Sequence, residues 1–237
     1  LPHGEEAFAN KLTKTHETEM PAAPHHRADL YDLSVHSSDF TIVKYGLPTG
    51  PNVAVLGSAR YCRRWLRQLK HWVRPAEGLP RGEGLRLVLF LPKPEKIVDW
   101  RELERVLDFL GDRPGVTLLV KAHPRRGGRH RLVRRDGEWD LEVTETAERE
   151  SLASIRAPGP DAKWISAAAE MESGALVSWA HVILALGTSV TWEAVATNKP
   201  VLELSWCHGS RTTMATFLPS TDMRCRDDLL EALARIE

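Results

Sequence analysis

Three stretches of this sequence place anion-binding side chains directly after runs of apolar residues. They read GSAR at 57–60, KAHPR at 121–125 and GTS at 187–189. Lysine, arginine and histidine side chains give charge-assisted hydrogen bonds to phosphate oxygens, and glycine lets a ligand come close to the backbone. The residue types therefore predict binding of a phosphate or diphosphate group.

The first stretch combines Gly57, Ser58 and Arg60 after the apolar run 52–56. Gly57 lets the backbone approach a ligand, and Ser58 can cap a following helix whose free N–H groups attract anions. An ordinary capped junction between a strand and a helix has the same residues, so this stretch alone does not define a site.

The second stretch contains Lys121, His123 and Arg125 and follows an apolar run, VTLLV. Pro124 disfavours a helical conformation at His123 and keeps that residue extended. We therefore expect the three side chains to converge at the end of a strand. The further arginines at 129–135 are expected in a loop that faces water, because runs of charge usually do.

The third stretch, Gly187, Thr188 and Ser189, lies between the apolar run 181–186 and a helical pattern. Thr188 and Ser189 would stand at the N-terminus of that helix, where anions bind. Glu193, one turn further on, could accept hydrogen bonds from a ribose. A plain helix cap with an acidic residue in the first turn would show the same pattern.

Expected strands and helices alternate along most of the chain. The strands are expected at 31–36, 52–56, 85–91, 116–120, 162–166, 181–186 and 200–204, and the helices at 58–73, 99–110, 167–180, 189–197 and 227–236. Unbroken apolar strands between helices are typical of a parallel sheet covered on both faces. The sequence thus predicts a doubly wound, Rossmann-like α/β domain at 53–237. Ligands of such sheets bind beyond the carboxyl ends of the strands.

The composition narrows the functional classes. The chain has 237 residues, and its 32 lysines and arginines balance its 32 aspartates and glutamates, which argues against a dedicated nucleic-acid binder. Its 3 cysteines show neither a zinc spacing nor a disulfide framework, so a reducing cytoplasm is the expected compartment. No apolar run reaches the ~18 residues of a membrane span. The P-loop signature and the three-glycine dinucleotide fingerprint are absent.

The order of these motifs resembles that of the GT-B transferases that build bacterial surface polymers. The resemblance also rests on His3-Gly4, on TSVTWE at 188–193 and on TNKP at 197–200. It is strongest to the CDP-glycerol glycerophosphotransferases (teichoic acid polymerases), with the related capsule-polysaccharide and Kdo transferases. Against that pattern most of an N-terminal domain is missing before Leu1. Residues 1–52 are therefore interpreted as a remnant of that Rossmann-like domain and the interdomain linker.

The resemblance implies a metal-independent transferase without a cofactor, in which a nucleotide-activated donor is a substrate. His3 would be the catalytic base, and His123 would act on the donor diphosphate. Together with the residue patterns, it predicts a donor-nucleotide site of Gly57, Ser58, Arg60, Lys121, Arg125, Gly187, Thr188, Ser189 and Glu193. It favours a CDP- or CMP-linked donor and an acceptor that is a glycan or polyol phosphate, lipid-linked or not. The protein would be cytoplasmic, with peripheral association at the inner face of the membrane as one option.

Two other functions stay open. The UDP-sugar 2-epimerases share the architecture of two Rossmann-like domains and need acidic residues for proton abstraction from the sugar. Alternatively, a non-catalytic module could bind polyanionic glycans, nucleic acid or lipid head groups through the arginine-rich stretch 125–135. The zero net charge weakens this last interpretation, because the acidic residues at 138–150 can neutralise the stretch.

Overall fold

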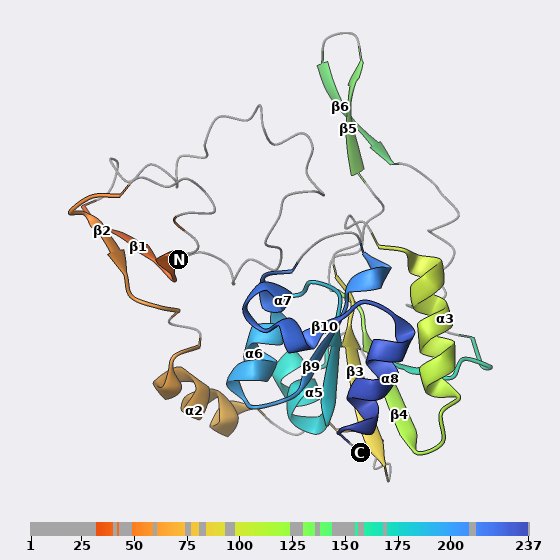
Figure 1. The fold of residues 1–237 in the computed structure, drawn as a ribbon. Coiled ribbons are helices and arrows are strands. Elements are labelled where there is room, and N and C mark those ends of the chain that lie inside the picture. The colour runs from red at the N-terminus through yellow and green to blue at the C-terminus, as the bar shows by residue number, and fades with distance from the viewer. Residues whose placement is uncertain are drawn as a thin grey trace. The chain divides into compact units, whose positions relative to one another are not determined.

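The structure is a computed structural model (Figure 1). It describes residues 32–39, 42, 49–58, 61–73, 77–80, 84–92, 98–123, 130–135, 138–143, 155, 159–167, 170–208 and 212–236, with the backbone alone at 130–143. The described residues up to Trp72 belong to one compact unit, and those from Val73 onward belong to a second. The predicted domain boundary, between residues 52 and 53, differs from this division.

The second unit is built on one parallel sheet of six strands. Its strands are β3 (Leu85–Phe90), β4 (Val116–Lys121), β7 (Ile165–Ser166), β8 (Val182–Ala185), β9 (Val201–Leu204) and β10 (Asp222–Met223). They lie in the order β10-β9-β8-β3-β4-β7, and every neighbouring pair is parallel. Counted within the sheet, this is the 3-2-1-4-5-6 order of the Rossmann fold. The predicted doubly wound α/β fold is confirmed.

Helices cover both faces of this sheet. They are α3 (Trp100–Gly111), α5 (Ser173–Trp179), α6 (Val190–Ala196), α7 (Thr213–Phe217), α8 (Arg226–Ala234), and the short 3₁₀ helices η5 (Ser205–Cys207) and η6 (Pro219–Thr221). Helices α3 and α8 cover one face of the sheet, and α5 and α6 cover the other (Figure 1). Buried side chains of each pair pack on the sheet face that the pair covers. Leu87 and Leu89 of β3 point to the first face, whereas Val88 and Phe90 point to the second. Both faces are buried, which is why the strands are continuous apolar runs rather than alternating ones.

Helices α3 and α5 differ in how well the local sequence predicts where they begin. Asp99 caps α3, because its Oδ1 accepts the N–H of Glu102 at 2.9 Å, and α3 begins where the sequence predicts. At its end Gly111 lies so close to Lys163 that a Cβ there would be 2.3 Å from the Lys163 Cβ. In contrast, α5 begins only at Ser173, six residues later than predicted.

The first unit contains a short parallel pair of strands and one helix among its described residues. The strands are β1 (Ser34–His36) and β2 (Val53–Val55), and the helix is α2 (Arg63–Trp72). Trp65 and Trp72 make an edge-to-face contact with ring centroids 5.6 Å apart. The helix was predicted from residue 58 but begins at Arg63; Ser58 is not helical, and Gly57 before it takes a positive φ of 76°.

The charged insert between β4 and β7 contains a β-hairpin that the sequence analysis missed. Strands β5 (His130–Arg135) and β6 (Glu138–Val143) pair antiparallel. The register places Arg131 opposite Glu142 and Arg135 opposite Glu138. The expectation of a loop is therefore wrong for 130–135, which form a strand, and the basic run has an acidic strand as its partner.

No helix in the described part of the chain is long and apolar enough to cross a membrane.

Candidate functional site

The strand order defines where a ligand is expected. The chain moves from β3 to β4 and β7 on one side, and then returns to place β8, β9 and β10 on the other side. The reversal lies between β3 and β8, and open α/β sheets bind their ligands at such a reversal, outside the carboxyl ends of the strands. The loops that follow β4 and β8 both reach this edge, since these two strands flank β3.

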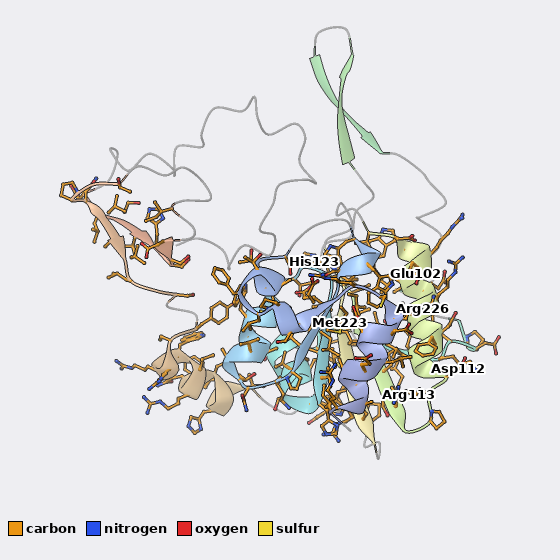
Figure 2. The ribbon with its side chains drawn as sticks, in the orientation of Figure 1. Glu102, Asp112, Arg113, His123, Met223 and Arg226 are labelled. Carbon is orange, nitrogen blue, oxygen red and sulfur yellow. The ribbon has the colours of Figure 1, made fainter. Side chains whose placement is uncertain are left out.

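Lys121 and His123 follow the strand that was predicted to deliver them. Lys121 is the last residue of β4 and is 8% exposed, and its carbonyl oxygen accepts the N–H of Leu91 at 2.9 Å. Burial lowers the pKa of Lys121, and the charge of Glu170 acts in the opposite direction. His123 is half-buried just beyond the strand. Figure 2 shows it at the end of this unit opposite to Arg113, which precedes β4.

The turn between β8 and α6 comprises Gly187, Thr188 and Ser189, and we call it the β8–α6 turn. Gly187 has a φ of 64°, which favours glycine, and its N–H donates to Oε2 of Glu203 at 3.0 Å. Ser189 is the N-cap residue of α6, but its side chain makes no capping hydrogen bond. Among the described residues, none is a hydrogen-bond partner of the buried Thr188 Oγ1.

A buried hydroxyl without a partner is uncommon in proteins and calls for an explanation. The hydroxyl of Thr188 lies in the predicted donor site, and a ligand oxygen would supply its missing partner. The backbone N–H of Gly187 cannot serve the ligand in the same way, because Glu203 already accepts it. Any contribution of Gly187 is therefore through the shape of the turn.

Glu193 lies buried against the neighbouring helix. Its exposed fraction is 7%, and a Cβ at Gly174 of α5 would be 3.1 Å from Glu193 Oε1. The carboxylate of Glu193 therefore contacts the first turn of α5. A ribose could contact it only if the ligand reached as far as this helix. The ribose contact stays a prediction.

Glu203 was not predicted as a site residue. It lies in the middle of β9, is 1% exposed, and has a pKa raised to about 7 by burial, with the N–H of Gly187 opposing the rise and Asp222 adding to it. A signal was present in the sequence, since Glu203 interrupts the apolar strand PVLEL. A charged residue inside such a strand must be paired or must change its protonation.

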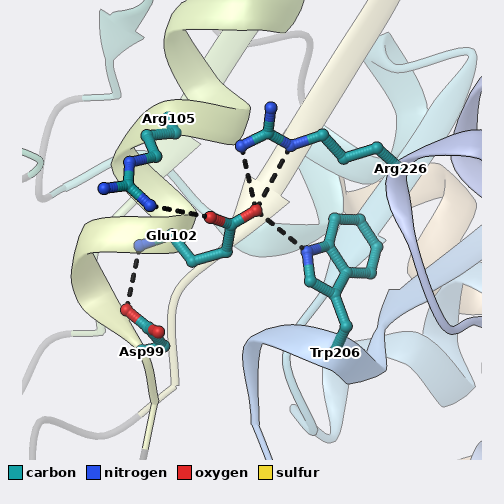
Figure 3. Close-up of polar contacts among 5 residues, drawn as sticks. All are labelled: Asp99, Glu102, Arg105, Trp206 and Arg226. Carbon is teal, nitrogen blue, oxygen red and sulfur yellow. Dashed lines mark hydrogen bonds and ion pairs between the residues drawn. The ribbon is translucent and has the colours of Figure 1, made fainter.

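A second polar group at the same edge was also missed. We call it the Glu102 cluster, and it consists of Asp99, Glu102, Arg105, Trp206 and Arg226 (Figure 3). Oε1 of Glu102 accepts from Nε and Nη2 of Arg226 at 3.2 and 2.9 Å and from Nε1 of Trp206 at 3.3 Å. These contacts tie α3 to η5 and to the start of α8.

Lys199, part of the TNKP motif, lies at the amino end of the sheet. Its Nζ donates to the carbonyl oxygens of Ser178 at 3.1 Å and Ala180 at 2.6 Å. Arg86 donates to the carbonyl oxygen of Trp179 at 2.8 Å. Both cations therefore stabilise the C-terminus of α5, which is a structural role.

The remaining predicted residues are not brought to this edge by the described structure. Gly57 and Ser58 follow β2 in the first unit. His3, Arg60 and Arg125 lie outside the described residues. The structure thus assembles Lys121 and His123 with the β8–α6 turn at the carboxyl edge of one sheet, and their roles stay predictions.

The sequence matches no protein-family model and no curated protein. The fold, however, is similar to that of solved structures. A putative UDP-N-acetylglucosamine 2-epimerase from Listeria monocytogenes superposes with a TM-score of 0.53 at 14% identity, over 88% of this chain and 52% of that chain. A UDP-GlcNAc 2-epimerase from Neisseria meningitidis bound to UDP-GlcNAc gives 0.50 at 12% identity, over 88% and 54%.

The wall teichoic acid polymerase TagF is a weaker match, with a TM-score of 0.46 at 11% identity over 91% of this chain and 52% of that chain. At these identities the likeness shows the fold, which is the GT-B-type, Rossmann-like α/β fold expected from the sequence. The chain spans about half the length of the structures it matches.

Proposed function

We propose that the unit from Val73 onward binds the diphosphate of a nucleotide-activated donor at the carboxyl edge of its sheet. The observation that carries this proposal is the reversal of strand order between β3 and β8. It places the end of β4, with Lys121 and His123, and the β8–α6 turn on either side of β3. Strand spacing separates the two by about 10 Å, an interval that these side chains and a diphosphate can bridge.

The groups at this edge suit an anion. Lys121 supplies a positive charge, His123 a ring nitrogen, and Thr188 a buried hydroxyl that has no partner among the described residues. In a transfer reaction a base takes a proton from the acceptor hydroxyl as that oxygen attacks the donor. The leaving nucleotide then gains negative charge, which Lys121 and His123 would stabilise. His3 stays the proposed base, by the resemblance alone.

For the whole protein we propose a metal-independent glycosyl- or glycerophosphotransferase that builds a surface polysaccharide or a teichoic-acid-like polymer. Its donor would be CDP- or CMP-linked, and its acceptor a glycan or polyol phosphate on the cytoplasmic side of the membrane. These finer statements rest on the resemblance of the motifs. Because the chain spans half of the matched structures, this unit alone is expected to bind the donor with little turnover.

A second candidate is a UDP-sugar 2-epimerase or a related UDP-sugar enzyme. It is favoured by the fold likeness to two UDP-GlcNAc 2-epimerases, one of them bound to UDP-GlcNAc. A CDP-linked donor and a UDP-sugar share the diphosphate and differ in the nucleobase, so the nucleobase that binds separates the two candidates.

Calorimetric titration of the 237-residue chain with CDP, CMP, UDP and GDP tests both candidates. Selective binding of a cytidine nucleotide, lost in His123→Ala, supports the polymer transferase. A preference for UDP supports the second candidate. Lys163→Ala is the matched control, because it removes an exposed cation that pairs with Asp112 at the amino end of the sheet. Absence of binding by any nucleotide, or equal binding in His123→Ala, contradicts the proposed donor site.

A further inference from the structure

Glu203 is a carboxylate buried inside the sheet. Its register partners are Ala185 in β8 and Asp222 in β10. Because Ala185 packs toward α5 and α6, the side chain of Glu203 lies on that same face, behind the β8–α6 turn. Its exposed fraction of 1% leaves almost no access to water.

The hydrogen bond from Gly187 to Glu203 defines how β8 turns into α6. The parallel pairing of β8 with β9 ends at Ala185, so the strand ladder offers no acceptor for the next buried N–H groups. A buried N–H without an acceptor is costly, and Oε2 of Glu203 accepts that of Gly187 at 3.0 Å. Glu203 therefore holds the β8–α6 turn at Gly187, where the backbone takes a positive φ.

The charges around Glu203 favour its neutral form. Strand β9 packs on β8, β10, α6, η6 and α8. Of these, β8 and η6 carry no ionisable side chain, and α8 covers the other face of the sheet. Among the described residues of these elements, the ionisable groups on its own face are Asp222 of β10, which pairs with Arg224, and Glu193 of α6. Both are carboxylates, and the hydrogen bond that Glu203 accepts comes from the uncharged backbone N–H of Gly187.

We propose that Glu203 is a positioning residue of the donor site: it holds the β8–α6 turn from behind and takes up a proton when a phosphate group binds in front of it. A phosphate brings further negative charge toward a buried carboxylate, so the neutral acid becomes the favoured form. The proton comes from solvent. The carbonyl oxygen of the acid still accepts from Gly187, so the turn keeps its conformation. This inference rests on the proposed function, because it needs a phosphate at this turn.

The free protein meets the conditions for such coupling. Burial raises the pKa of Glu203 to about 7, so a modest further rise on binding changes its protonation near neutral pH. If binding raises the pKa by one unit, the protein takes up about half a proton at pH 7.5, and its affinity falls about sixfold between pH 6.5 and pH 8.5.

The test is titration of the full chain with the nucleoside diphosphate that binds it, in two buffers of different ionisation enthalpy. Wild type is compared with Glu203→Gln, whose amide carbonyl can still accept from Gly187 but which cannot take up a proton. We expect about half a proton of uptake at pH 7.5 in wild type and a loss of that component in Glu203→Gln. The ionisation of the ligand and of His123 is common to both proteins and cancels in the comparison.

Glu102→Gln is the matched control, since it removes a carboxylate at the same edge that is paired with Arg226. It should leave proton uptake as in wild type. Equal uptake in wild type and Glu203→Gln, with nucleotide bound by both, overturns this inference and leaves the proposed function intact. If wild type binds no nucleoside diphosphate, the proposed function fails and this inference falls with it.

A second variant keeps the test decisive if Glu203→Gln does not fold. Asp222→Asn removes a negative charge that helps to raise the pKa of Glu203. The pH at which proton uptake is greatest should then move to a lower value than in wild type. An unchanged pH profile in a folded Asp222→Asn protein contradicts the role of Glu203.

Discussion

Two carboxylates at the carboxyl edge of the sheet, the partly buried Glu102 and the fully buried Glu203, have pKa values that are shifted in opposite directions. Burial alone would raise the pKa of Glu102, but hydrogen bonds from Trp206 and Arg226, with the charge of Arg226, lower it below its usual value. Among the residues that the structure describes, the hydrogen-bond donor to Glu203 is the N–H of Gly187, and burial raises the pKa of Glu203 to about 7. The first group is a fixed charge, and the second can change its charge near neutral pH.

This difference between Glu102 and Glu203 distinguishes a cluster with a structural role from a candidate binding site. The Glu102 cluster ties α3, η5 and α8 together, and each of its polar atoms named above has a partner inside the fold. The β8–α6 turn, in contrast, combines a weakly satisfied carboxylate with the buried hydroxyl of Thr188, which lacks a partner among the described residues. Polar groups that the fold does not satisfy are where a ligand gains most, so the turn is the better candidate for binding.

The largest expected effect is the contribution of Glu203 to the pH dependence of the free energy of unfolding. Its pKa in the folded chain is above the ordinary value of 4.5, so folding favours the protonated form. That stabilisation is present below pH 4.5 and is lost as the pH rises through 7, by about 3 kcal/mol in the free energy of unfolding. Urea unfolding of wild type and Glu203→Gln between pH 4.5 and 8 checks this. Parallel curves for the two proteins would show that Glu203 titrates normally.

The second largest effect is expected for Glu102, the carboxylate that stays charged. Glu102→Ala removes the acceptor shared by Arg226 and Trp206, and should lower the free energy of unfolding by about 2 kcal/mol, as expected for hydrogen bonds to a charged group. Arg105→Ala serves as control, because Arg105 is 69% exposed and such pairs contribute under about 1 kcal/mol. Urea unfolding at pH 7 measures both. A Glu102→Ala protein as stable as the control would remove the structural role of the cluster.

Thr188→Val should separate binding from stability. The substitution removes a buried hydroxyl that no described residue satisfies, so the free protein should be as stable as wild type or slightly more stable. Nucleotide affinity should fall about tenfold, the value of one hydrogen bond of ~1.4 kcal/mol. Thermal unfolding and calorimetric titration measure the two quantities. Thr188→Ser keeps the hydroxyl and should bind like wild type, so equal affinity in all three proteins would exclude a contact from this group.

The smallest effect is expected for Trp206→Phe. This change keeps an aromatic ring but removes the Nε1–H that donates to Glu102 at 3.3 Å. Because Arg226 still donates to the same carboxylate, the free energy of unfolding should fall by under about 1 kcal/mol. The pKa of Glu102 should rise, since one of the hydrogen bonds that lowers it is gone. Nucleotide affinity should not change, and a loss of affinity would place the Glu102 cluster in the site.

The fold was predictable where local sequence carries the signal. Continuous apolar runs identified β3, β4, β8 and β9, because strands buried on both faces need apolar residues at every position. Helix α3 was predicted at 99–110 and lies at Trp100–Gly111, with Asp99 as its cap. The hairpin of β5 and β6 was missed, since the adjacent arginines of β5 resemble a solvated loop.

The candidate site was predictable only in its outline. The positions of Lys121, His123 and Thr188 after strands follow from the sequence, because parallel strands present their carboxyl ends at one edge. The sequence does not show which of these groups already have hydrogen-bond partners within the fold. Lys199 belonged to the motif TNKP, yet it stabilises the end of α5 through Ser178 and Ala180.

By itself, the sequence determined the strands buried on both faces and which side chains follow them, because burial of both faces and the change from strand to helix are local properties. The tertiary structure decided which of those segments become neighbours. Gly187 meets Glu203, 16 residues further on, because β8 pairs with β9. Glu102 meets Arg226 across 124 residues, because α3 and α8 cover the same face. Hydrogen bonds between such distant residues depend on strand order, and strand order is a property of the folded chain.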